Sequence, residues 1–138
     1  MNLDTKQKVL IAIYTEYQKD LPDMRNTIKA SLLGIENQAF CVAIEKLENE
    51  RLIKGANIAK AKGRALAIYT DSIMMTPEGI EYVENKLGIE KSMSGVEKVQ
   101  EMTKKSVAWG WNEFKDITVQ VLAEMGKHGM DKILGKEE

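Results

Sequence analysis

The sequence predicts a mainly α-helical fold with a small β-hairpin, and three observations indicate it. Apolar residues recur at three- and four-residue spacing up to about Leu52, which is typical of amphipathic helices. From there to Met75 the pattern changes to alternation and to β-branched and aromatic residues, which favour strands. Helical spacing returns after Pro77, one of only two prolines in the chain.

Composition and charge narrow the classes of function. A chain of 138 residues with a net charge of −1 suits one globular domain with an appendage, and contact with nucleic acid would need a local basic patch. Cys41 is the only cysteine, expected as an apolar filler, and His128 is the only histidine, expected to be solvated. We therefore expect no disulfide, metal site or cofactor. Phosphate-binding loops and nucleophile motifs are also lacking, so we do not expect an enzyme.

The N-terminal half predicts three helices. Asp4 or Thr5 can cap the first, because either side chain can accept a hydrogen bond from a free backbone N–H. A short second helix is expected over residues 24–35 and a longer third helix over 36–53. The expected buried face of the third helix consists of Phe40, Ala43, Ile44 and Leu47. A short helix, a turn with glycine and a longer helix form a helix-turn-helix pattern.

The alternating region predicts a hairpin. Residues 52–59 and 64–75 read as two strands, and the basic turn KAKGR joins them. A hairpin directly after a helix-turn-helix is a wing. Thr76 can then cap a further helix with Pro77 at its first position, and Gly88 stops it. The order of elements predicts a winged helix-turn-helix domain over residues 1–89.

Residues 90–138 predict a C-terminal helical extension that starts near Ser94, with a first apolar stripe at Val96, Val99 and Met102. Gly110 is expected within a helix, where it marks a kink or a close helix crossing. The extension can fold back on its own domain, pair with a second chain or bind a host protein. We favour self-association, which predicts a homodimer. The residues expected at that contact are Val107, Trp111, Phe114, Val121, Leu122 and Met125.

Two motifs resemble a known family. The third helix ends in a turn that contains Leu52, Ile53 and Gly55, and Thr76, Gly79 and Tyr82 open the helix after the wing. Over roughly the first 90 residues this arrangement is similar to the YjcQ-type proteins of Gram-positive bacteria and their phages. The resemblance implies a winged-helix fold and a phage or prophage setting, and it implies no particular activity.

Double-stranded DNA is the partner that this fold favours. We expect phosphate contacts from cations of the wing and of the second helix, and base contacts from two amides that open the third helix. The candidate residues are Lys54, Lys60, Lys62 and Arg64 in the wing, Arg25 and Lys29 at successive turns of the second helix, and Asn37 and Gln38. Lysines also suit any solvated wing, and Asn37 and Gln38 also suit any helix start. The leading interpretation is a dimeric phage or prophage transcriptional regulator.

The third helix also carries acids that argue against a conventional DNA-reading helix. Glu36, Glu45, Glu48 and Glu50 repel phosphate, and only Lys46 and Arg51 offset them. This acidity suggests either DNA contact dominated by the wing or a protein partner. The alternative function is therefore a protein-interaction module, such as a phage factor that binds and inhibits a host protein. The N-terminal residues lack an apolar leader and no run is long enough to span a membrane, so we expect a cytoplasmic protein without membrane contact.

Overall fold

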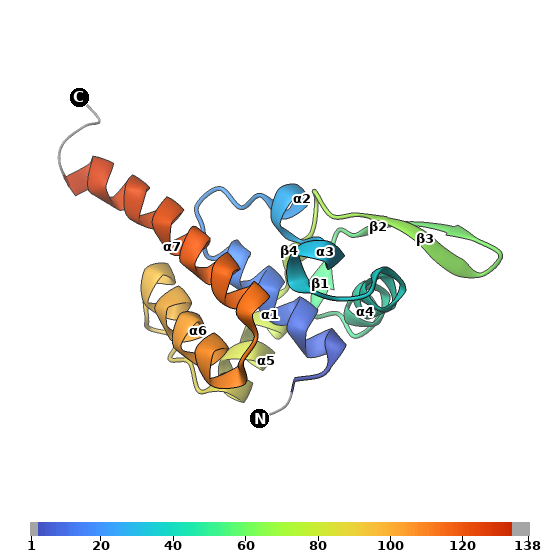
Figure 1. The fold of residues 1–138 in the computed structure, drawn as a ribbon, viewed down its shortest axis with the longest axis horizontal. Helices are drawn as coiled ribbons and strands as arrows, with labels where there is room; N and C mark the ends of the chain where they lie inside the picture. The colour runs from blue at the N-terminus through green and yellow to red at the C-terminus, as the bar shows by residue number, and fades with distance from the viewer. Residues whose placement is uncertain (1–2, 134–138) are drawn as a thin grey trace.

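The computed structural model describes the backbone of residues 3–133 and the side chains of 3–63 and 67–126. The helices are α1 (Thr5–Tyr17), α2 (Met24–Thr27), α3 (Ala30–Leu33), α4 (Asn37–Asn49), α5 (Pro77–Leu87), α6 (Gly95–Trp109) and α7 (Asn112–Ile133) (Figure 1). The strands are β1 (Ile53–Lys54), β2 (Asn57–Ala61), β3 (Arg64–Tyr69) and β4 (Met74–Met75). The expected fold class is confirmed: a winged helix-turn-helix with a helical extension.

Helix α1 lies at the centre of the fold. Asp4 caps it, because its side chain accepts from the N–H of Gln7 at 2.8 Å while the Gln7 side chain accepts from the N–H of Asp4. Every residue from Val9 to Glu16 is buried, so the helix has neighbours on all sides. It packs against α4, α5, α6 and α7, which makes it the common support of the wing and the extension.

The predicted single helix over 24–35 is wrong, because the chain breaks it into α2 and α3. Lys29 has an extended backbone, with φ −136° and ψ 141°. Ile28 and Leu33 are both 1% exposed. In one continuous helix, residues five apart would point about 140° away from each other. The break lets both side chains reach the same core. The predicted end at Gly34 is confirmed.

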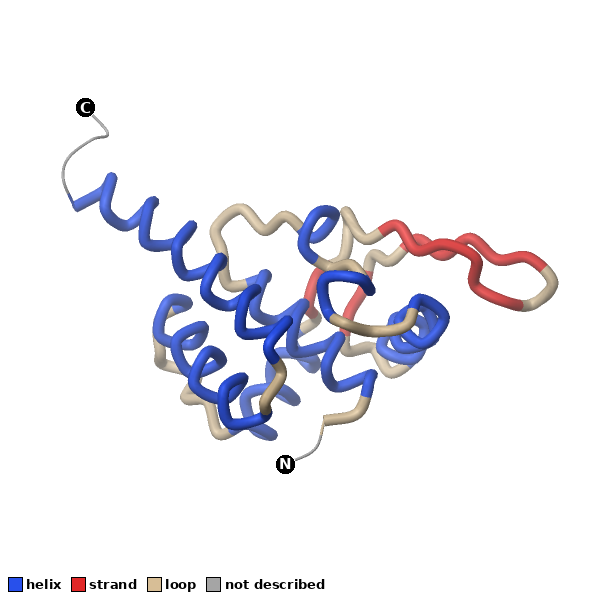
Figure 2. Tube along the Cα trace, in the orientation of Figure 1, coloured by secondary structure: helices blue, strands red, loops and turns tan. Residues whose placement is uncertain are grey.

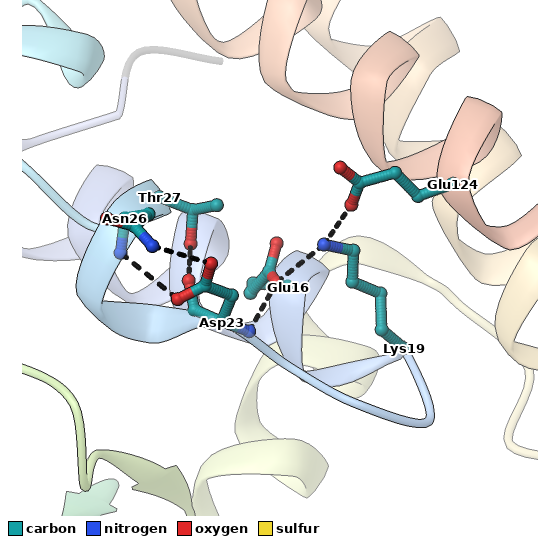
Figure 3. Close-up of polar contacts among 6 residues, drawn as sticks. All are labelled: Glu16, Lys19, Asp23, Asn26, Thr27 and Glu124. Atoms are coloured by element: carbon teal, nitrogen blue, oxygen red, sulfur yellow. Dashed lines mark hydrogen bonds and ion pairs between the residues drawn. The ribbon is translucent and has the colours of Figure 1, made fainter.

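A polar network fixes the start of α2 and ties it to α7 (Figure 3). Glu16 is fully buried, and its carboxylate accepts from the N–H of Asp23 at 2.7 Å and from Lys19 at 2.8 Å. Asp23 in turn caps α2 by accepting from the backbone N–H of Asn26 at 3.3 Å, and it also accepts from the Asn26 side-chain amide at 2.8 Å. Lys19 also pairs with Glu124 on α7. The network therefore sets the position of the short helix that carries Arg25.

The hairpin is confirmed, although its predicted long strands are interrupted. Strand β1 pairs with β4, and β2 pairs with β3 in a separate antiparallel sheet. Between these sheets Gly55 lies so close to the segment that joins β3 and β4 that an added Cβ would be 2.0 Å from the Ser72 carbonyl oxygen. At the tip, Lys62 and Gly63 both have positive φ, which a two-residue type I′ turn requires. The β2–β3 hairpin projects from the helical body (Figure 2).

The junction between the wing and α5 explains the residues that resemble the YjcQ pattern. The hydroxyl of Thr76 accepts from the N–H of Gly79 at 2.9 Å and donates to the Arg51 carbonyl oxygen at 2.7 Å. Gly79 lies against the backbone, since an added Cβ would be 2.0 Å from the Leu52 carbonyl oxygen. Threonine and glycine at this spacing thus hold α5 directly on the end of α4.

The extension forms a helical hairpin that packs on the rest of the chain. Helix α6 starts next to Ser94, as expected; the Ser94 side chain caps it, and Gly110 ends it with φ +70°. The prediction that Gly110 lies within a helix is therefore wrong, because the chain turns back there to begin α7. Helices α6 and α7 lie side by side, and both contact α1 (Figure 1).

The apolar stripe of the extension is buried within its own chain. Phe114 and Trp111 are 0% and 6% exposed, and the Trp111 indole N–H donates to the Leu33 carbonyl oxygen at 3.0 Å. Val121 is 2% exposed, and Leu122 and Met125 are half-buried. Trp111, Phe114 and Val121 already fill the core in this conformation, so they are not exposed to a second chain. The homodimer itself stays a prediction.

Two members of the predicted stripes lie outside the core. Val107 is 60% exposed and Val96 is 37% exposed, because α6 turns only Val99 and Met102 of its apolar residues inward to full burial. Met102, Trp111 and Phe114 share one hydrophobic core with residues of α1 and α4. Within residues 3–133, no helix is long and apolar enough to cross a membrane.

Candidate nucleic-acid interface

A groove of about 780 Å³ separates the helix-turn-helix from the wing. One wall comes from α2, α3 and the extended residues between them, and the N-terminal half of α4 closes the groove on a second side. Residues Ile68–Asp71, at the end of β3 and just beyond it, form the remaining wall. Strand β3 pairs only with β2 among the described strands, so its other edge lies toward this opening.

Three of the predicted DNA-contacting residues meet in this groove. Arg25 and Lys29 line it, both exposed, and neither forms an ion pair with any other described side chain. Lys29 lies between α2 and α3, so its predicted place one turn after Arg25 on a single helix is wrong. Asn37 opens α4 and also lines the groove, whereas Gln38 is half-buried and does not.

The floor of the groove is apolar. Ile28, Phe40 and Cys41 line it and are 1%, 4% and 2% exposed. Burial, aided by the negative charges of Glu45 and Glu36, raises the pKa of the Cys41 thiol above its ordinary value. Cys41 therefore stays a neutral thiol at physiological pH, which fits its expected role as an apolar filler.

Tyr69 is the groove residue that the sequence analysis did not single out. It ends β3 opposite Asn57, lines the groove and is 59% exposed. An aromatic ring this exposed loses the favourable burial that its size would allow. The sequence contained one indication of it, an isolated aromatic residue at the end of a strand whose preceding residues, ALAI, are small or aliphatic.

The wing lysines differ in how they are held. Lys60 pairs with Glu45 on α4, with 2.8 Å between the ammonium nitrogen and the carboxylate oxygen. Lys54 in β1 and Lys62 at the tip are exposed and form no ion pair among the described side chains. The side chain of Arg64 lies outside the described residues. Lys60 thus ties the wing to α4, while Lys54 and Lys62 present their charges to solvent.

The four acids of α4 all have structural partners. Glu36 accepts from two N–H groups of the first turn of α4, each at 3.0 Å. Glu48 accepts from the N–H of Ala56 at 2.9 Å, and Glu45 holds Lys60 as described. Glu50 pairs with Lys6 of α1 at 2.7 Å. These carboxylates cap the helix, fix the wing and bind α1, so their charges are partly compensated within the chain.

Taken together, a helix-turn-helix, a projecting basic hairpin and a groove between them define a winged helix-turn-helix protein. The family model described as YjcQ protein matches residues 7–102, from α1 into α6. That match covers more than half of the chain, and the protein belongs to the YjcQ family. A search of curated proteins and a search of solved structures returned no match.

Proposed function

We propose that this protein binds DNA, as a transcriptional regulator in a phage or prophage setting. The observation that carries the proposal is the arrangement of uncompensated cations. Arg25 and Lys29 line the groove, Lys62 lies at the tip of the β2–β3 hairpin and Lys54 lies in β1, at the base of the wing. These four charges come from two separate stretches of sequence.

The physical basis of binding is the release of counterions. Each lysine or arginine that neutralises a phosphate frees condensed cations, so affinity falls steeply as the salt concentration rises. Four such contacts would give a slope of log affinity against log salt of roughly −3 to −4. Asn37, at the exposed start of α4, is the residue that we propose for contact with base edges.

The alternative function is the binding of a host protein through the acidic face of α4, and it stays a prediction. We rank DNA binding above it, because each of the four acids has an intramolecular partner that accounts for its position without a second protein. DNA binding also does not depend on dimerisation through α7. A homodimer would need a surface other than the buried part of that helix, and Val107 is the exposed member of the predicted stripe.

A salt titration tests the proposal. Fluorescence anisotropy of a labelled short duplex should show binding at low salt that disappears as salt is raised. The double variant Lys54→Ala/Lys62→Ala should reduce the magnitude of the salt slope by about 2, one unit for each lost phosphate contact.

Lys91→Ala/Lys104→Ala is the matched control, because both lysines are exposed away from the wing and the groove, Lys91 between α5 and α6 and Lys104 on α6. It removes the same net charge and should leave the slope close to that of the wild type. Absence of duplex binding at low salt, or an equal loss in both double variants, would contradict the proposal.

A further inference from the structure

The groove contains more than a phosphate site requires. Phosphates need cations, and Arg25 and Lys29 would suffice for them. The groove also has an apolar floor of buried side chains and an aromatic ring, that of Tyr69, which is 59% exposed on its wall. These features suit a flat, apolar ring system that arrives together with negative charge.

We propose that the groove binds an unpaired nucleotide of the DNA, with its base stacked on Tyr69 and its flanking phosphates held by Arg25 and Lys29. This inference rests on the proposed DNA binding and specifies the kind of DNA. Proteins that bind single strands combine a cationic groove with aromatic side chains in this way, because every base has a face on which a ring can stack.

A base within a perfect duplex cannot use this groove. Its two faces are covered by neighbouring bases, so a side chain can stack on it only after the base has left the helix. The volume of about 780 Å³ falls within the range of roughly 300–1,000 Å³ usual for sites that enclose small molecules. An unpaired base therefore has room to enter, whereas an intact duplex could reach only the rim.

Polar groups on the wall indicate which edge of the base is held. Asn37 can both donate and accept a hydrogen bond, as the edges of bases require. Asp71 is the acid among the lining residues, and its negative charge repels phosphates, which leaves Arg25 and Lys29 to hold them. A carboxylate at that position accepts from an exocyclic amino group. The site thus favours cytosine, adenine or guanine over thymine.

The wing and the groove then bind different parts of one DNA molecule. Lys54 and Lys62 contact the phosphates of a paired segment, and the groove takes a base that is extruded or unpaired beside it. The preferred ligand is accordingly a duplex that carries a bulge or a locally open stretch.

The test compares three DNAs of matched sequence: a perfect duplex, the same duplex with a bulged cytosine, and the single strand. Anisotropy competition with the full chain should show that the bulged duplex binds roughly ten- to a hundredfold more tightly than the perfect one. Tyr69→Ala should abolish this preference, and Tyr69→Phe should retain it, because the ring that stacks is kept.

Tyr82→Ala is the matched control, since Tyr82 is an exposed tyrosine on α5, away from the groove. It should leave the preference unchanged. Equal affinity for bulged and perfect duplexes, or a Tyr69→Ala variant that keeps the preference, would overturn the groove proposal while duplex binding through the wing still holds. If none of the three DNAs binds, the proposed function itself fails and this inference with it.

Discussion

The wing and the C-terminal extension are both attached to the helical body of the protein, and they differ in how much of their surface is buried. The β2–β3 hairpin projects from the body and exposes most of its residues (Figure 2). The α6–α7 hairpin packs on α1 and α3 and buries Met102, Trp111 and Phe114 in the common core. The comparison teaches that the apolar stripe of the extension is buried against its own chain, while the basic hairpin stays exposed and available for a partner.

The difference predicts that the extension contributes stability and the wing contributes binding. Burial of large apolar side chains in α7 removes apolar surface from water, which is the main favourable term in folding. The exposed wing lysines contribute little to folding, since surface substitutions usually change stability by no more than about 0.5 kcal/mol. The predictions below run from the largest expected effect to the smallest.

Phe114→Ala is the most severe test of a docked extension. Phe114 is fully buried and stacks on Trp111 with 4.7 Å between the ring centroids. Removing the ring should lower the free energy of unfolding by about 3–5 kcal/mol in urea titrations. Val119→Ala, at a half-exposed position of the same helix, should change it by less than about 0.5 kcal/mol. Similar values for the two variants would mean that α7 does not pack on the body in solution.

Gly79→Ala tests the junction between the wing and α5. The new methyl group would overlap the Leu52 carbonyl oxygen, so the helix must shift, and the free energy of unfolding should fall by about 1–3 kcal/mol. Gly126→Ala places the same group in open space on α7 and should raise stability by about 0.5–1 kcal/mol. Thermal unfolding measures the stability of both variants. If both are less stable than the wild type, close backbone contact at Gly79 does not explain the loss.

Trp111→Phe isolates one hydrogen bond between the extension and the helix-turn-helix. Phenylalanine keeps an aromatic ring beside Phe114 but leaves the buried carbonyl of Leu33 without its indole donor. The expected loss in the free energy of unfolding is about 1 kcal/mol or somewhat more. Trp109→Phe is the control, because Trp109 is only half-buried. A larger loss of stability in Trp109→Phe than in Trp111→Phe would mean that the hydrogen bond of Trp111 is not the main contact between the extension and the helix-turn-helix.

The Lys60–Glu45 pair should make the smallest contribution. Its side chains are 55% and 28% exposed, so solvent screens the attraction. A double-mutant cycle with Lys60→Ala and Glu45→Ala should give a coupling free energy of about 0.2–1 kcal/mol. If the coupling exceeds this range clearly, the wing is held to α4 much more firmly than an exposed pair allows.

The spacing of apolar residues and the positions of helix caps could be predicted from the sequence. The change of spacing near Leu52, the caps at Asp4 and Thr76, the helix start near Ser94 and the basic turn at Lys62 depend on nearby residues, and all of them are confirmed. The same holds for the fold class that follows from their order.

Contacts between residues far apart in the chain could not be predicted from the sequence. The break between α2 and α3 arises because Ile28 and Leu33 must share one core, which depends on where α1 and α4 lie. The docking of Trp111 on Leu33 joins residues 78 positions apart. A stripe that fits a second chain fits the same chain equally well, so periodicity could not decide between them.

The candidate site was predicted in part. Arg25, Lys29 and Asn37 were chosen for charge and position, and the structure brings them to one groove. Tyr69 was missed, because only the fold shows that its ring is left exposed beside those cations.

The most direct measurement is a map of backbone amide chemical shifts in the full chain during titration with bulged duplex DNA. The account predicts the largest changes in residues 24–37 and 57–71, which form the groove and the wing, with little change over α6 and α7. Changes concentrated in α6 and α7, with the hairpin unaffected, would contradict it.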